Sequence, residues 1–158
     1  MQNKAVLSGG CLCGSIRYKV SGERIFSIVC HCRMCQRASG APFIAIFFVA
    51  TASIKLEHGQ PLTYRSSPQV LRHFCGGCGS PLFFDRLSRP EMRAVFVGSL
   101  DDSNEFVPEM QVCMSSSVGW LPTLESVPKY AEKPEGMTPT FAYNVVTGEA
   151  ITGSTSGA

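Results

Sequence analysis

The chain has 158 residues, 44% of them hydrophobic and 16% charged, with a formal net charge of +2. This length suits one compact domain and leaves little room for a second. The few positive charges are scattered, which argues against binding to a nucleic-acid backbone as the main function. The longest apolar run, residues 41–50, is shorter than the roughly 20 residues that cross a bilayer, so no membrane span is predicted. The start lacks the apolar core of a secretory signal, and a cytoplasmic protein is expected.

Short runs of β-branched and aromatic residues alternate with Gly and Pro, which predicts a mainly β domain with little helix. The expected strands are 15–20, 27–32, 43–49, 53–57, 62–65, 70–74, 81–84, 93–98 and 110–114. Residues 33–38 predict one helical turn, ended by Gly40 and Pro42. We therefore predict a domain over residues 5–131. Residues 132–158, rich in Pro, Gly, Thr and Ser, are predicted to form an extended tail whose last residues are disordered.

Cysteine makes up 8 of the 158 residues, about 5%, below the roughly 8–10% of a small disulfide scaffold. Seven of the cysteines form three groups, which are Cys11 and Cys13, then Cys30, Cys32 and Cys35, then Cys75 and Cys78. In a reducing compartment such spacing favours thiolate ligands over disulfides. Cys113 stands alone in MQVCM and is expected to be a small apolar residue in a buried strand.

The cysteine spacings suit metal binding because residues i and i+2 of a strand point to one face, and the glycines of CGGCG allow a tight turn. A structural zinc site has four ligands, whereas a catalytic site commonly has three and one open position. The seven grouped cysteines divide naturally into such a set of four and a set of three. His31, His73 or Cys113 could still supply a fourth ligand to the second set, so the spacing alone leaves that site open or closed.

Three stretches carry a family resemblance: GGCLCGSIRY at residues 9–18, CHCRMCQRASGAPF at 30–43 and FCGGCGSPLFF at 74–84. They resemble the signatures of the glutathione-dependent formaldehyde-activating enzyme family, which includes the centromere protein V type domain. The resemblance implies an Mss4-like fold, a zinc-binding arrangement of small antiparallel β-sheets. It also implies two zinc ions per chain, a structural one held by Cys11, Cys13, Cys75 and Cys78 and a catalytic one held by Cys30, Cys32 and Cys35.

Three thiolates around Zn²⁺ give a formal charge of −1, which suits a soft ligand better than strong activation of water. A thiol such as glutathione could lose its proton there and add to an aldehyde such as formaldehyde. The reverse step breaks a carbon–sulfur bond, and the resemblance implies a carbon–sulfur lyase. Arg33 and Arg37, four residues apart, would share a helix face and could clamp the carboxylates of glutathione, or only offset the charge of the zinc site.

Other residues near the cysteines have two readings. His31 lies between two cysteines and would point to the opposite strand face, where it could form a structural hydrogen bond or act as an acid or base. His73 adjoins the CGGCG turn and is expected to be a strand residue rather than a ligand.

Two other functions compete with the enzyme. One is a non-catalytic Mss4-like zinc-binding module for protein or chromatin interaction, with both zinc sites structural. The other is a thiol redox sensor. A free, exchangeable position at the three-cysteine site would favour the enzyme, whose partners are a small thiol and an aldehyde rather than nucleic acid or membrane. The oligomeric state cannot be derived from the sequence.

Overall fold

The computed structural model describes residues 6–132 and confirms the mainly β prediction, with ten strands and one α-helix. The strands are β1 (Leu7–Gly10), β2 (Arg17–Val20), β3 (Arg24–Cys30), β4 (Ile44–Ala50), β5 (Ile54–His58), β6 (Leu62–Ser67), β7 (Val70–Phe74), β8 (Pro81–Arg86), β9 (Met92–Phe96) and β10 (Met110–Val112). The helix α1 (Arg33–Ser39) occupies the predicted helical turn.

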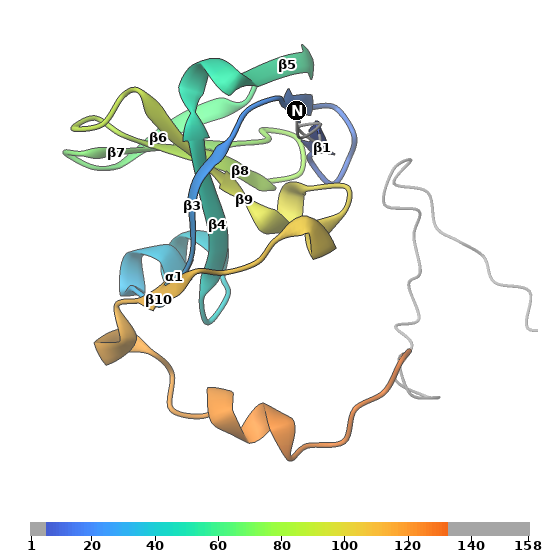
Figure 1. The fold of residues 1–158 in the computed structure, drawn as a ribbon, viewed down its shortest axis with the longest axis vertical. Coiled ribbons are helices and arrows are strands. Elements are labelled where there is room, and N and C mark those ends of the chain that lie inside the picture. The colour runs from blue at the N-terminus through green and yellow to red at the C-terminus, as the bar shows by residue number, and fades with distance from the viewer. Residues whose placement is uncertain (1–5, 133–158) are drawn as a thin grey trace, which may run out of the picture. The chain divides into compact units, whose positions relative to one another are not determined.

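The strands form two sheets. One has three strands in the order β1-β2-β5, and the other has seven in the order β10-β3-β4-β9-β8-β7-β6 (Figure 1). The predicted antiparallel pairing holds for every pair except β10 with β3, which is parallel. The connection over residues 97–109 crosses back past β4 and β3 before β10 begins, and such a crossover of a dozen residues produces a parallel pair.

The interior strand β4 buries both of its faces. Phe47 and Val49 pack with Tyr18 of β2 in a cluster between the two sheets. Ile46 and Phe48 point to the opposite face and pack in a second cluster that includes Cys35 of α1. Since alternate residues of a strand face opposite ways, this one apolar run supplies two cores. In Figure 1, α1 and β10 lie together at one end of β3 and β4.

Two expectations about individual segments need correction. β1 is not among the expected strands, and its sequence LSGG is poor in strand formers. Gly9 is needed there because an added Cβ would clash with the Ser99 backbone oxygen. The prediction that Cys113 is buried in a strand is wrong. β10 ends at Val112, and Cys113 is exposed with a φ of 59°.

The chain divides into two compact units, one ending at Val118 and one beginning at Gly119. The described part of the second unit contains a 3-10 helix, Leu121–Glu125, and an exposed ion pair between Lys129 and Glu125. The boundary predicted at residue 131 stays a prediction, and the tail beyond residue 132 lies outside the described residues. Within residues 6–132, no helix has the length and apolar character needed to span a membrane.

Candidate metal centres

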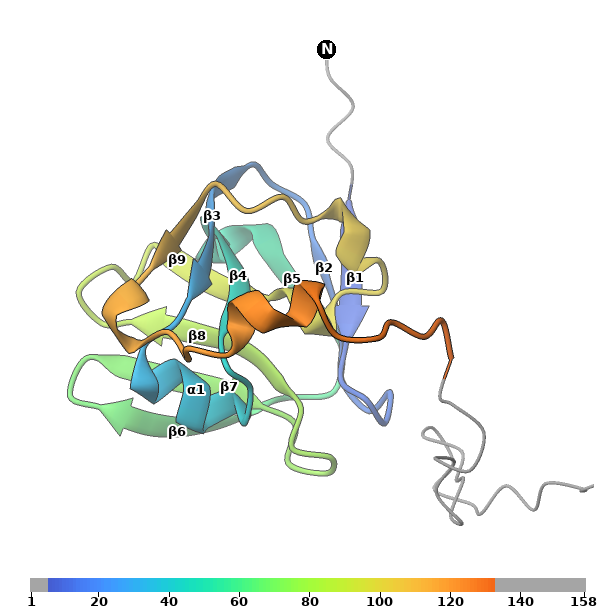
Figure 2. The ribbon, with the colours of Figure 1, turned by 90° about the horizontal axis from the view of Figure 1, so that it is seen from below.

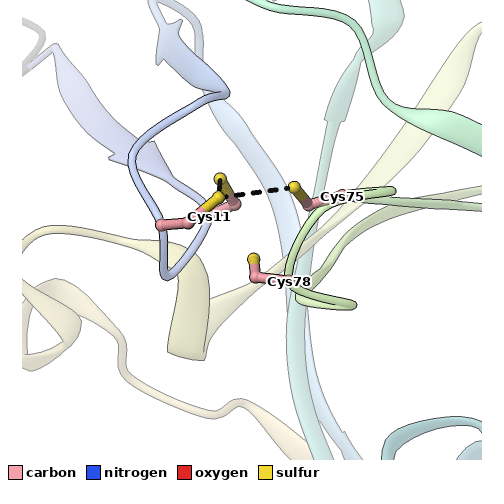
Figure 3. Close-up of side chains that lie close together, drawn as sticks. Cys11, Cys75 and Cys78 are labelled. Atoms are coloured by element: carbon pink, nitrogen blue, oxygen red, sulfur yellow. Dashed lines mark hydrogen bonds between the residues drawn. The ribbon is translucent and has the colours of Figure 1, made fainter. Parts of the chain in front are cut away.

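Four cysteines from two distant loops come together in one cluster. Cys11 and Cys13 lie between β1 and β2, and Cys75 and Cys78 lie between β7 and β8 (Figure 3). All four sulfurs lie within 4.8 Å of one another, with 3.5 Å between those of Cys11 and Cys13 and 3.8 Å between those of Cys13 and Cys75. Tetrahedral zinc with Zn–S bonds of about 2.3 Å places its sulfurs about 3.8 Å apart. The cluster therefore fits a four-thiolate metal ion.

The two loops of this four-cysteine cluster are built alike. In each, a Cys-Gly-Ser sequence closes the turn, and the glycine, Gly14 or Gly79, has a φ of 75° or 76°. The amide of Gly14 donates to the Cys11 carbonyl at 3.1 Å, and the amide of Gly79 donates to the Cys75 carbonyl at 2.8 Å. Glycine adopts this left-handed conformation without the clash of a Cβ, so the turn can bring both sulfurs of a pair to one side.

The serine of each turn contacts the sulfurs. The Ser15 hydroxyl lies 3.1 Å from the sulfur of Cys13 and 3.4 Å from that of Cys75, and the Ser80 hydroxyl lies 3.2 Å from that of Cys78. Burial opposes ionisation of Cys78, but hydrogen bonds led by those of Ser80 outweigh it and lower the pKa of this thiol to about 6. Sequence reasoning missed both serines, although the repeated Cys-Gly-Ser pattern signals them.

The second cluster lies where β3 leads into α1. Cys30 ends β3, Cys32 is the N-cap of α1, and Cys35 is in its first turn, with the three sulfurs within 4.8 Å of one another. The backbone N–H of Cys35 donates to the Cys32 sulfur at 3.3 Å. The cap thus fixes two sulfurs of this three-cysteine cluster relative to the helix.

Burial makes two thiols of the three-cysteine cluster hard to ionise. It raises the pKa of Cys30 to about 12 and is also the main cause of the raised pKa of Cys35. Burial opposes ionisation of Cys32 too, but hydrogen bonds led by the Cys35 backbone N–H outweigh it and lower its pKa. A metal ion that binds here must displace protons, so its binding releases them to solvent.

None of the three residues considered as a fourth ligand joins the three-cysteine cluster in the described part of the chain. His31 is 2% exposed, and its Nε2 lies 2.9 Å from Oε1 of Gln111 on β10. His73 uses both ring nitrogens, Nδ1 with the Thr63 hydroxyl and Nε2 with Asp85, each at 2.9 Å. Cys113 is exposed and lies in neither cluster. The burial of His31 favours its structural reading.

A cavity of about 890 Å³ is lined by residues of α1 and of β6 to β9. Arg33 and Arg37 both line it, as their spacing on one helix face predicts. Arg33 and Arg37 are both exposed, and Arg33 donates to Oε1 of the buried Gln36. A third arginine, Arg72 of β7, lines the same cavity and lies 4.0 Å from the Cys35 sulfur. Sequence reasoning did not connect it with the cysteines.

Fold and clusters together define a small β-sheet protein with two groups of cysteines that could hold metal ions. A family described as glutathione-dependent formaldehyde-activating enzyme matches residues 6–116. The chain therefore belongs to this family, and the resemblance stated from the sequence is confirmed.

Individual proteins show the same relationship. A protein of Halomonas elongata named "putative glutathione-dependent formaldehyde-activating enzyme" is 26% identical over 125 residues, covering 73% of this chain and 80% of that protein. A protein of Schizosaccharomyces pombe, named as an uncharacterized lyase, is 34% identical over 76 residues, covering 48% of this chain and 55% of that protein. The crystal structure of a Rhodobacter sphaeroides protein matches with a TM-score of 0.55 and 20% identity, covering 66% of this chain and 99% of that one, which shows a shared fold.

Proposed function

We propose that the protein is a zinc-dependent carbon–sulfur lyase-like enzyme that adds a small thiol of the glutathione type to an aldehyde such as formaldehyde and reverses this addition. One observation carries the proposal: within residues 6–132, one cysteine cluster has four sulfurs while the other has three. A complete set of four suits a closed structural site, and a set of three leaves a coordination position for substrate. The name of the family supports the choice of thiol and aldehyde.

In this proposal Cys11, Cys13, Cys75 and Cys78 hold a structural zinc ion. The cluster joins the β1–β2 loop to the β7–β8 loop, and these loops belong to different sheets. Cys11 and Cys75 are buried in the core between the two sheets. A metal ion at this position contributes directly to the free energy of folding, because it ties together two parts of the chain that are far apart in sequence.

Cys30, Cys32 and Cys35 hold the catalytic zinc ion in this proposal. Zinc held by these three thiolates would supply a soft Lewis acid that favours the ionised form of a substrate thiol. In the addition, the thiol sulfur forms a bond to the carbonyl carbon, and the π electrons of the C=O bond move to oxygen, which takes up a proton. The reverse step returns that proton and breaks the carbon–sulfur bond.

The free thiols of the chain are those expected in the reducing cytoplasm, where we place the protein.

The surrounding residues would position the reactants rather than exchange protons with them. Arg33 and Arg37 lie on the cavity side of α1, where their guanidinium groups can bind the carboxylates of the thiol. The backbone N–H of His31 donates to the Val112 carbonyl at 3.1 Å, and its ring contacts Gln111. His31 therefore joins the end of β3 to β10 and holds the cysteines on either side of it in place.

The test measures zinc content and thiol addition on the same samples. Native mass spectrometry on protein purified without chelator gives zinc per chain. Two-dimensional exchange NMR then gives the rate at which glutathione and formaldehyde interconvert with S-hydroxymethylglutathione. We expect the wild-type protein to carry two zinc ions and to accelerate the exchange, and the Cys32→Ser variant to lose one zinc ion and the acceleration.

Cys113→Ser is the matched control, because Cys113 is a cysteine outside both clusters. It should keep both zinc ions and the full rate. A wild-type protein that carries two zinc ions and leaves the exchange at the buffer rate would overturn the proposal in favour of a structural zinc-binding module. Reversible disulfide formation among Cys30, Cys32 and Cys35 with loss of zinc would favour a redox sensor instead.

A further inference from the structure

The charged side chains that line the cavity beside α1 are all positive. Its lining, all of it in the described part of the chain, includes Arg33, Arg37 and Arg72 and no aspartate or glutamate. Much of the remaining wall is apolar and includes Met34 and Phe74. In Figure 2, α1 lies in front of β6 and β7. Such a cavity suits an organic anion, because the apolar wall takes its carbon skeleton and the arginines take its charge.

Arg72 is the most deeply placed of the three arginines, with 9% of its surface exposed. Its Nε donates to the Ser66 hydroxyl at 3.0 Å, and its guanidinium carbon lies 5.6 Å from the centre of the Phe84 ring. Its Nη2 lies 4.0 Å from the Cys35 sulfur, while its Nη1 is buried and has no hydrogen-bond partner. The side chain is thus held in one orientation with part of its donor capacity unused.

The cavity beside α1 carries a surplus of positive charge. No carboxylate within the described residues pairs with its guanidinium, and burying a charge without a partner is costly. A zinc ion held by the three-cysteine cluster would bring a formal charge of −1, which leaves three arginines with a surplus of two positive charges. An occupant with one or two carboxylates would offset that surplus.

We propose that Arg72 is the inner specificity residue of a carboxylate subsite, in which the cavity holds the carboxylate-bearing part of the thiol that reacts at the three-cysteine cluster. The inference rests on the proposed function for the place of the reacting sulfur, but the carboxylate contact itself needs no reaction. The size of the cavity, about 890 Å³, fits a peptide-sized molecule and far exceeds formaldehyde. The sequence distance between Arg72 and Cys35 explains why the subsite is visible only in the fold.

The test uses a probe that cannot react. S-Methylglutathione keeps both carboxylates but has no free thiol, and its diethyl ester lacks both negative charges. Calorimetry on the zinc-loaded protein gives the Kd of each. We expect the wild-type protein to prefer the acid over the ester by about tenfold or more, the range for a charge-assisted hydrogen bond. Arg72→Met and Arg72→Lys should lose most of this preference, because neither offers the planar guanidinium fork.

Arg65→Met is the matched control. Arg65 lies on β6 between two residues that line the cavity but does not line it itself, so its loss removes a nearby charge without touching the subsite. This variant should keep the preference for the acid. Native mass spectrometry on every variant establishes that both zinc ions are retained.

Two results would overturn the inference. One is an Arg72→Met variant that keeps both zinc ions and the wild-type preference for the acid. The other is an Arg72→Met variant that loses zinc together with an Arg72→Lys variant that keeps both the zinc ions and the preference for the acid. Arg72 would then serve only as a positive charge that offsets the cysteine thiolates. Acid-selective binding without any thiol addition would overturn the proposed function alone.

Discussion

The hydroxyl of Ser80 accepts a hydrogen bond from the backbone N–H of Leu12 at 3.0 Å, across 68 residues of sequence. Leu12 lies between Cys11 and Cys13, and Ser80 follows Cys78 in its turn. The two loops of the four-cysteine cluster are therefore joined by protein contacts as well as by a shared metal position. Such contacts would orient the sulfurs for a metal ion that binds between the loops.

The two clusters should respond differently to loss of one cysteine. Replacing Cys75 by Ser removes a proposed zinc ligand that is 1% exposed in the core between the sheets, so we expect loss of zinc together with loss of cooperative folding. Replacing Cys32 by Ser removes a proposed zinc ligand at the start of a short helix, so we expect one zinc ion fewer in a protein that still folds. Thermal unfolding followed by circular dichroism, with zinc counted by native mass spectrometry, distinguishes the two. Equal loss of folding would contradict the division into structural and catalytic sites.

The cysteine pairs could be predicted from the sequence because each depends on local spacing, whereas the family resemblance implied that the two distant pairs share one site. The CxC and CxxC pairs each need only one turn to bring their sulfurs together, and the turn glycines are visible in the sequence. The contact between Arg72 and Cys35 depends on how β7 pairs and where α1 packs, which no local pattern specifies. The parallel pairing of β10 with β3 is non-local in the same way.

Replacing Gly79 should destabilise the protein because of its backbone conformation and not because of its neighbouring atoms. An added Cβ would meet nothing within 4 Å, yet the φ of 76° strains any residue with a side chain. We expect Gly79→Ala to lower the free energy of unfolding by about 1–2 kcal/mol and to weaken zinc binding at the four-cysteine cluster. Chemical denaturation and competition with a zinc chelator measure the two effects.

Gly98→Ala is the control for Gly79. Its added Cβ also meets nothing within 4 Å, and its φ is not in the left-handed region. This variant should be neutral or stabilise the protein by about 0.4–1 kcal/mol, because alanine restricts the unfolded chain. Similar losses in both variants would show that the φ of Gly79 is not the reason for its presence.

Gln36 holds two backbone segments next to the three-cysteine cluster. Its Nε2 donates to the His31 carbonyl at 2.6 Å and to the Ser116 carbonyl at 2.9 Å, and its side chain is buried. Gln36→Met keeps the length of the side chain but leaves both carbonyls without this donor, so we expect a loss of about 1–3 kcal/mol in the free energy of unfolding. Gln69→Met, at an exposed position, should change it by less than about 0.5 kcal/mol. Equal effects in denaturant titrations would contradict the role of the amide.

Ionisation of the buried Tyr18 should lower the stability of the folded protein at high pH. The Tyr18 side chain is 0% exposed, and its hydroxyl lies 2.6 Å from the Ser99 hydroxyl. Because the Ser99 hydroxyl donates its proton to the Phe96 carbonyl at 2.7 Å, the Tyr18 hydroxyl is the donor in its bond with Ser99. Burial raises the pKa of Tyr18 to about 12. In the unfolded chain a tyrosine ionises near pH 10, so the unfolded state gains charge first as the pH rises. The contribution of Tyr18 to stability is therefore complete below about pH 10 and falls by about 3 kcal/mol towards pH 12.

The Tyr18→Phe variant isolates this effect. Phenylalanine cannot ionise, so the unfolding free energy of the variant lacks the part of the pH dependence that comes from Tyr18. All other groups titrate as in the wild type. We expect the difference in unfolding free energy between wild type and variant to shrink between about pH 10 and pH 12, measured by urea denaturation at matched zinc content. A difference that stays constant over this range would mean that Tyr18 ionises at the same pH in the folded and unfolded states. Its burial between the two sheets would then not restrict its charge.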